Sequence, residues 1–459
     1  MLLGYLVLAL ALFAVWVIGF HLGGYELFAP ISITPLAMLL GTILAAIGTR
    51  SWNNVALGPE AIAIILFGTI SFVAGCELFS KVICGNGRAF RGVLAERPAY
   101  EFGANSNNRK YWFLLALVII IAVLHMYEIM RLADTSDWTQ FSEVAKQVRN
   151  DTSSVFSSTG ISLDTGFPLY DRVLSKIRAA IGVVSAAAIP YEFIVRRRSF
   201  SQTIPVILTF LAAAAMSLVS GGRGGVVTLA LIMFLSLALS LQWRDGAKRS
   251  SMRTAIYCLA GGAALALLFY AMGFVVGRNP TGGIVGYLSF YLGAGVPSLE
   301  KVLDTPLMEY ALTGFNTLHD QYYLLAKIGL VGHVPAYGSQ FVLIGDYSSN
   351  VYTFAYRYYI DFGMPGVIVL SAVSGLSFTM LYKIALSCIH RPAVFFCYCT
   401  IGVQLFDIMR DEKLFAAVLT ANTAVTLALG VLITLWLYDP RFSLIKRTIA
   451  LPPMAKEAA

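Results

Sequence analysis

A glycine-bracketed arginine is the feature of this chain with the clearest chemical meaning. Arg223 stands in a Ser-Gly-Gly-Arg-Gly-Gly motif at 220–225. The neighbouring Gly222 and Gly224 allow the backbone to approach a ligand closely, and a guanidinium fork matches the oxygens of phosphate or carboxylate. The motif predicts an anion-binding turn. The structural alternative is a tight turn whose arginine reaches up to the lipid headgroups.

The flanks of this motif set its expected depth in a membrane. Two uncharged apolar runs, 204–219 and 226–241, have 16 residues each, or about 24 Å of helix. A bilayer core is about 30 Å thick, so two such short helices would hold Arg223 below the membrane surface. A cation at that depth is costly and usually faces a polar cavity or a partner.

A second polar segment, 346–363, is rich in tyrosine. If 351–361 is helical, Thr353, Arg357 and Asp361 share one face because they are four residues apart. Aromatic surfaces with a few polar groups suit sugar rings, and a carboxylate among them can act as a general base. The alternative is a structural Arg–Asp pair capped by interfacial tyrosines. The tyrosines expected beside this face include Tyr352, Tyr358 and Tyr359.

Four further polar residues are candidates, and each has an equally plain structural reading. Arg278 follows an apolar run and either binds an anion at the outer rim or anchors a helix at the interface. His319 and Asp320 are adjacent and form either a reserve catalytic pair or an ordinary surface pair. Arg410, in a charged turn, either guards a cavity or orients a helical hairpin.

The elements that must position these residues are membrane-spanning helices. The chain has 459 residues, of which 58% are hydrophobic and 13% charged, so we expect an all-α, polytopic bundle. The net charge of +8 does not indicate nucleic-acid binding, because the basic residues form short clusters between apolar runs. The six cysteines fall in or beside expected spans and show no disulfide framework.

About eleven spans are expected within one membrane domain, and 1–20 is read as a retained span rather than a signal peptide. Arg196, Arg197 and Arg198 mark the cytoplasmic side, which places 220–225 and 277–363 on the opposite face. The apolar run 284–296 is too short for a span and suits an interfacial or re-entrant segment. The expected spans are 2–20, 31–48, 60–82, 111–130, 173–195, 203–220, 225–242, 254–276, 364–388, 392–408 and 415–437.

Several nucleotide and metal signatures are absent from the sequence. There is no Asp-x-Asp, no P-loop, no His-Glu-x-x-His and no Gly-x-Ser-x-Gly. An enzyme of this composition would take its energy from a substrate that is already activated and carried on a lipid.

The order of motifs resembles that of the oligosaccharide repeat unit polymerases, the Wzy-type O-antigen polymerases. The resemblance covers roughly 200–440. It rests on the Ser-Gly-Gly-Arg-Gly-Gly motif, on Tyr-Leu-Gly-Ala-Gly-Val-Pro at 291–297, on Asn-Val-Tyr-Thr at 350–353, and on Tyr-Tyr-Ile-Asp-Phe-Gly-Met-Pro-Gly at 358–366. The first 200 residues match only as a generic series of spans.

This resemblance implies a multi-pass enzyme of the bacterial inner membrane. Such enzymes join undecaprenyl-diphosphate-linked repeat units on the periplasmic side, without a metal or other cofactor. By motif position it implies that Arg223, Arg278 and Arg357 stabilise the departing diphosphate. Asp361 is our first expectation for the base, with His319 and Asp320 in reserve. The implied partners are the lipid-linked oligosaccharide, membrane lipid and a chain-length regulator, with no nucleic acid.

Three other functions remain open from the sequence. An O-antigen ligase would use the same donor and the same arginine chemistry. A flippase or transporter for the same lipid predicts internal repeats and charges midway along several spans, neither of which is evident. A structural scaffold for glycan assembly predicts that changes at the charged positions are silent.

Overall fold

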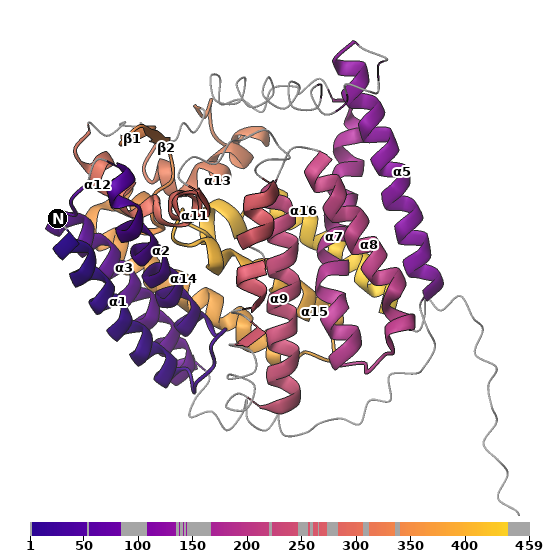
Figure 1. The fold of residues 1–459 in the computed structure, drawn as a ribbon, viewed down its shortest axis with the longest axis horizontal. Helices are drawn as coiled ribbons and strands as arrows, with labels where there is room; N and C mark the ends of the chain where they lie inside the picture. Colours follow the sequence, from indigo (N-terminus) through magenta and orange to yellow (C-terminus); the bar gives the residue numbers. More distant parts are fainter. Residues whose placement is uncertain are drawn as a thin grey trace, which may run out of the picture.

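The computed structural model describes most of the chain as helices that run side by side (Figure 1). The described residues are 2–52, 55–83, 108–134, 137, 141, 144, 167–219, 223–246, 256–257, 260–264, 266–272, 283–305, 312–335 and 340–438. The prediction of an all-α polytopic membrane bundle is confirmed.

Nine helices of this described part are long and apolar enough to cross a membrane. They are α1 (Leu2–Leu22), α2 (Pro30–Gly48, continued by η1, Thr49–Trp52), α3 (Pro59–Leu78, continued by η2, Phe79–Ile83), α5 (Asn108–Leu132), α7 (Leu169–Ile194), α8 (Phe200–Val219), α9 (Arg223–Asp245), α14 (Ala355–Ser387) and α16 (Ala421–Tyr438). The two other expected spans, 254–276 and 392–408, contain shorter apolar helices, Ala260–Met272 and Pro392–Asp407. The latter comprises α15 (Pro392–Gly402) and η4 (Val403–Asp407).

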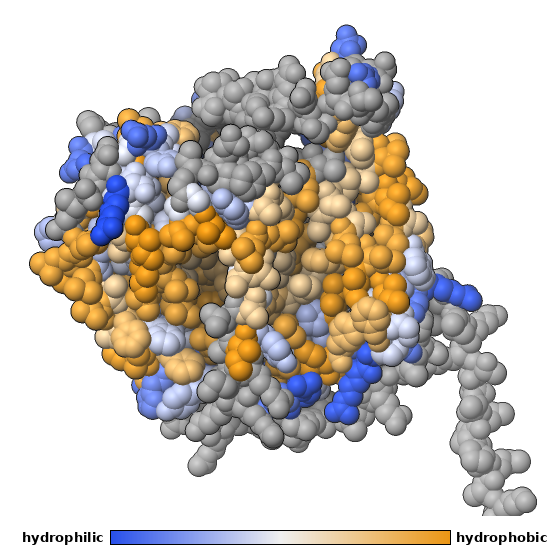
Figure 2. All heavy atoms as spheres, in the orientation of Figure 1, coloured by the Kyte–Doolittle hydropathy of each residue, from blue (hydrophilic) through white to orange (hydrophobic). Residues whose placement is uncertain are grey.

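The surface agrees with a membrane location. Figure 2 shows apolar side chains in a broad band across the middle of the molecule, with hydrophilic side chains gathered at its two ends. Helix α1, which contains no Asp, Glu, Lys or Arg, contributes to this band. Its Leu3 and Leu10 side chains are 69% and 61% exposed. Exposed leucines of this kind are at home in lipid.

The N-terminal helices pack into the C-terminal half rather than forming a separate unit. Helix α3 lies against α14 at two glycines. A Cβ atom added to Gly75 would lie 2.0 Å from the Ala372 carbonyl oxygen, and one added to Gly375 would lie 2.0 Å from the Phe72 carbonyl oxygen. Small residues that let two backbones meet are the usual means of packing helices in membranes.

The short elements gather at one end of the bundle, which we call the loop end (Figure 1). They are α11 (Gly283–Gly293), α12 (Gly295–Leu303), α13 (Phe315–Lys327) and an antiparallel hairpin of β1 (Val342–Ile344) and β2 (Tyr347–Ser349). Helix α11, in the apolar run expected to be interfacial or re-entrant, packs against the end of α2. A Cβ atom on Gly293 would lie 2.6 Å from the Ala45 nitrogen.

The opposite end carries the turn between α7 and α8, with Arg196, Arg197 and Arg198, and we call it the arginine end. The last turn of α8 and the first turn of α9 lie at the loop end (Figure 1). The expected spans 203–220 and 225–242 are present as α8 and α9, but both helices are longer than the uncharged runs from which a position of Arg223 below the membrane surface was expected. With 20 and 23 residues they are about 30 and 35 Å long, because both continue through polar residues beyond the uncharged runs.

Candidate functional site at the loop end

The second polar segment is built on a broken helix. Helix α14 begins at Ala355, and Gly363 interrupts it with φ 64° and ψ −159°. Glycine accepts this positive φ at no steric cost, and Pro365 follows because it needs no backbone N–H partner in a first helical turn. Arg357 and Asp361 therefore lie on one short helical segment. Thr353 precedes the helix, so the predicted three-residue face over 351–361 was wrong at its first member.

The chain before α14 is tied to the turn between α15 and α16. The Tyr352 backbone N–H donates to the Arg410 carbonyl oxygen at 2.9 Å, and the Phe354 N–H donates to the Ile408 carbonyl oxygen at 3.1 Å. These bonds bring a segment of the predicted loop beside residues that follow it by more than fifty positions. They hold the charged turn 407–413 next to the start of α14.

Arg357 forms the central ion pair of this region. Its Nε and Nη2 atoms donate to the two carboxylate oxygens of Asp411, each at 2.7 Å, and its Nη1 atom donates to the Asn316 carbonyl oxygen at 2.9 Å. The Arg357 side chain is only 10% exposed, whereas that of Asp411 is 39% exposed. Such a two-bond fork fixes the carboxylate in orientation as well as in position.

The pKa of Asp411 reflects this partner. Burial acts to raise the pKa, but the charge and hydrogen bonds of Arg357 outweigh it and hold the pKa below the ordinary value for an aspartate. The Glu412 backbone N–H adds a further bond to Asp411, at 2.8 Å. Asp411 is therefore an ionised, oriented and partly exposed carboxylate at neutral pH.

Asp361 is occupied at the start of α13. One carboxylate oxygen accepts from the Asn316 backbone N–H at 3.2 Å and from its side-chain amide at 2.9 Å, and the other accepts from the Thr317 N–H at 2.6 Å. Helix α13 follows Gly314, which offers no side-chain cap. Asp361 thus supplies, from another helix, the anion that a helix N-terminus favours.

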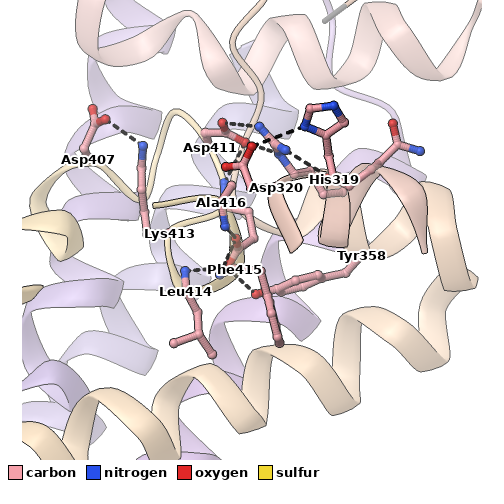
Figure 3. Close-up of polar contacts among 12 residues, drawn as sticks. His319, Asp320, Tyr358, Asp407, Asp411, Lys413, Leu414, Phe415 and Ala416 are labelled. Carbon is pink, nitrogen blue, oxygen red and sulfur yellow. Dashed lines mark hydrogen bonds and ion pairs between the residues drawn. The ribbon is translucent and has the colours of Figure 1, made fainter. Parts of the chain in front are cut away.

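The Glu412 side chain bonds the backbone of the turn that carries Asp411. It is 1% exposed and accepts hydrogen bonds from the backbone N–H groups of Leu414, Phe415 and Ala416 at 2.5 to 2.8 Å. The Tyr358 hydroxyl donates to it at 2.7 Å, and Figure 3 shows the tyrosine pointing at this turn. Burial raises the pKa of Glu412, while these donors oppose the rise.

Two further sets of polar contacts belong to this region, one around Asp407 and one on α13. Asp407 accepts from Lys413 Nζ at 2.8 Å and from Arg410 Nη1 at 3.2 Å. On α13, His319 Nδ1 lies 3.2 Å from an Asp320 carboxylate oxygen, and the Asp320 side chain is 43% exposed. Asn316, whose carbonyl oxygen accepts from Arg357, lies one helical turn before this pair on α13. The structure therefore places the reserve pair on the helix that Arg357 contacts.

The tyrosines do not form one common face. The Tyr352 hydroxyl donates to the Gln340 carbonyl oxygen, and the Tyr359 hydroxyl donates to Glu60 at the start of α3. Tyr358 points to Glu412, as described above. The Thr353 side chain is fully buried, and its hydroxyl makes no hydrogen bond within the described chain. These tyrosines connect α14 and the chain before it to α3, to the turn between α15 and α16, and to the chain before β1. They do not form one surface on which a sugar could lie.

The glycine–arginine motif is only partly described. Arg223 opens α9 at the loop end, and Gly224 follows it with no atom within 4 Å of an added Cβ. Gly222 and Arg278 lie outside the described residues. The backbone thus places Arg223 at the same end of the bundle as Arg357.

Basic residues on α7 were missed from the sequence. Lys176 bonds the Asn422 side-chain oxygen at the start of α16, and Arg178 donates to the Met216 carbonyl oxygen at 3.2 Å. Met216 lies in the last turn of α8, just before the glycine–arginine motif. The sequence signal was available: basic residues at the end of a span opposite the arginine cluster are an exception to the positive-inside pattern.

The charges of the loop end are divided between two sides. Around Arg357 the described chain has five carboxylates and three cations, an excess of two negative charges: Asp320, Asp361, Asp407, Asp411 and Glu412 against Arg357, Arg410 and Lys413. At this end, α7 and α9 carry four cations, Arg172, Lys176, Arg178 and Arg223, against one carboxylate, Asp171. An anion would therefore be favoured at the α7–α9 side, and proton acceptors lie at the α13–α14 side.

Among the described residues, no three His, Cys, Asp or Glu side chains are placed to hold a metal ion. Comparison of the chain with protein-family models, with curated proteins and with solved structures gave no match. The assignment of a function therefore rests on the site itself and on the motif order described above.

Proposed function

We propose that this protein is a membrane glycosyltransferase that polymerises undecaprenyl-diphosphate-linked oligosaccharide units at its loop end, facing the periplasm of a bacterial cell. The observation that carries the proposal is the division of the loop end into a cationic side and an acidic side. A transfer between two lipid-linked sugars needs both: cations for the departing diphosphate and a carboxylate for the acceptor hydroxyl. The motif order supports the same function.

The donor diphosphate is assigned to the cationic side. Arg178 lies against the last turn of α8, and Arg223 is the first residue of the next helix, α9. Guanidinium groups held in a low-dielectric site stabilise charge on diphosphate oxygens without reorganising during the reaction. Arg278 is expected to contribute from the segment after the eighth expected span.

The proton of the acceptor hydroxyl is assigned to Asp411. The acceptor oxygen forms a bond to the anomeric carbon of the donor chain while the bond from that carbon to the diphosphate breaks. The electron pair of the broken bond stays on the diphosphate, and the acceptor proton passes to the Asp411 carboxylate. Asp411 is suited to this step because it is ionised, 39% exposed and held in one orientation.

The other two motif residues receive positioning roles. Arg357 is committed to Asp411 through two hydrogen bonds, so we assign it the orientation of that carboxylate. Asp361 is committed to the start of α13, which carries His319 and Asp320. It therefore positions the helix that borders Asp411, in place of the base role that the sequence suggested.

The test expresses each variant in cells that lack the native protein. The readout is the length of the lipid-linked product chains. Arg178→Gln is compared with Arg197→Gln, which removes the same charge from an exposed side chain at the arginine end. Removing one preorganised donor typically slows a reaction about 100- to 1000-fold. We expect Arg178→Gln and Asp411→Asn to abolish long-chain banding at normal protein levels, and Arg197→Gln to restore it fully.

The form of the residual product separates the alternatives. A polymerase defect leaves lipid A core carrying one repeat unit, whereas a ligase defect leaves bare core. If long-chain banding persisted in both Arg178→Gln and Asp411→Asn, the division of roles proposed here would be wrong. Loss of lipid-linked units from the outer leaflet in Asp411→Asn would instead indicate a transporter.

A further inference from the structure

The arginine end contains a polar network that the proposed function does not use. Glu192, near the end of α7, is fully buried and accepts from the Tyr438 hydroxyl at 2.7 Å. Tyr438 in turn shares a hydrogen bond of 2.7 Å with Tyr111. Arg196 and Arg198 both form ion pairs with the same Glu192 carboxylate, at 3.3 and 3.0 Å. Four helix ends, those of α5, α7, α8 and α16, thus meet at one level.

Arg198 is only partly satisfied by this network. Its side chain is 8% exposed, and only its Nε atom reaches Glu192. Its Nη1 and Nη2 atoms lie below the protein surface and make no hydrogen bond to any described residue. A buried guanidinium without partners for its two terminal nitrogens is costly, and those nitrogens form the fork that binds phosphate oxygens.

The charge count gives the same indication. Lys110, at the first turn of α5, is 2% exposed and donates to the Trp436 carbonyl oxygen at 2.5 Å. Within the network Arg198 shares its carboxylate partner, Glu192, with Arg196, so one buried carboxylate serves two guanidinium groups. A buried guanidinium that shares its carboxylate and has two unbonded terminal nitrogens favours a further anionic partner.

The surroundings identify the kind of anion. Trp436, Tyr438 and Tyr111 lie at the level of the network, as tyrosine and tryptophan do at a membrane interface. The neighbouring aromatic side chains Trp112, Phe113 and Phe200 are 49%, 57% and 67% exposed. They offer an apolar surface on α5 and α8 for the acyl chains of a lipid whose headgroup reaches the cations. Basic pockets between spanning helices bind anionic headgroups in this way.

We propose that Arg198 binds the phosphate of an anionic membrane lipid at the arginine end of the bundle. The phosphate oxygens accept from the two terminal nitrogens of Arg198. The headgroup enters through a shift of the turn 195–199, in which Arg197 is exposed and has a φ of 52°. The bound lipid would join α7 and α8 to α5 and α16.

The experiment uses the full-length protein purified in detergent and then mixed with lipid. Retained phosphatidylglycerol is measured by native mass spectrometry, and the melting temperature is measured with phosphatidylglycerol, with phosphatidylcholine and with inorganic phosphate alone. Arg198→Gln is compared with Arg197→Gln, which makes the same charge change at the adjacent exposed position. Arg198→Lys keeps the charge but loses the fork.

We expect wild type and Arg197→Gln to retain phosphatidylglycerol and to melt at a higher temperature with it than with phosphatidylcholine. Arg198→Gln should bind it about tenfold more weakly, and Arg198→Lys should lie between. Protection by inorganic phosphate to the same extent would overturn the lipid as the source of the anion. Equal retention by Arg198→Gln and Arg197→Gln, with both folded as shown by their melting in phosphatidylcholine, would overturn the site.

Discussion

At the scale of single residues, the loop end is organised by partners that lie far away in the sequence. Arg357 is four residues from Asp361, yet it donates its fork to Asp411, while Asp361 bonds Asn316 and Thr317. Spacing along one helix predicted a pair of Arg357 with Asp361, but the 407–413 turn brings the Asp411 carboxylate to both Nε and Nη2 of Arg357. Asp411 is therefore the partner of the arginine, and Asp361 caps α13.

The ion pair leads to a prediction about acid stability. Because Arg357 holds the pKa of Asp411 below its ordinary value of 3.8, the pair stabilises the folded state fully above that value. Its contribution is lost as pH falls through the lower pKa of the folded state. We expect Asp411→Asn to cost at most about 1 kcal/mol at pH 7, because Asp411 is 39% exposed and screened by solvent.

The measurement is thermal or denaturant unfolding of wild type and Asp411→Asn between pH 7 and pH 3. The difference between the two proteins should shrink as the pH falls below about 4. Glu412, whose pKa is raised by burial and to a smaller extent by the charge of Asp411, gives a dependence of the opposite sign that is weaker in Asp411→Asn. A constant difference over this range would contradict the assignment.

At the scale of elements, α13 depends on a cap supplied by α14. We predict that Asp361→Ala costs about 1 to 2 kcal/mol, because it removes an acceptor from the helix N-terminus. Hydrogen exchange should be faster at the amides of 315–319 and unchanged in α3. Asp361→Asn, which keeps an acceptor oxygen, should be milder. Unaltered exchange in α13 would show that the cap is not needed.

The contact between α3 and α14 gives a second prediction at this scale. A Cβ atom on Gly375 would lie 2.0 Å from a backbone carbonyl oxygen, and backbone cannot rotate away as a side chain can. We expect Gly375→Ala to force the two helices apart and to destabilise the protein by about 3 kcal/mol. Gly262→Ala is the matched control, because no atom lies within 4 Å of its added Cβ. Equal melting temperatures for the two variants would disprove tight packing.

At the scale of the whole molecule, the two ends differ in charge and in elements, which predicts their sides of the membrane. Arg197 is exposed at the arginine end, and Leu330 is 71% exposed at the loop end. In intact cells with a permeable outer membrane, an impermeant maleimide should label Leu330→Cys and not Arg197→Cys. Labelling after lysis should reach both, and the parent protein reports the background from native cysteines. The reverse pattern would invert the orientation and remove the loop end from the periplasm.

The sequence by itself determined the class of this protein and most of its spanning helices. Long apolar runs must satisfy their backbone hydrogen bonds internally in lipid, so local composition is enough to predict them. The break at Gly363 was also predictable, because glycine and proline act on the backbone locally. The lengths of α8 and α9 were underestimated, since helices continue into polar residues beyond the apolar run.

Only the tertiary structure decided which charges meet. Asp411 reaches Arg357 because the turn between α15 and α16 bonds the chain before α14, and no periodicity links positions 54 residues apart. Arg178 reaches the end of α8, and Arg198 is left with two unsatisfied nitrogens, for the same reason. A side chain's chemistry is written in the sequence, but its partner depends on which helix ends the packing of the bundle brings together.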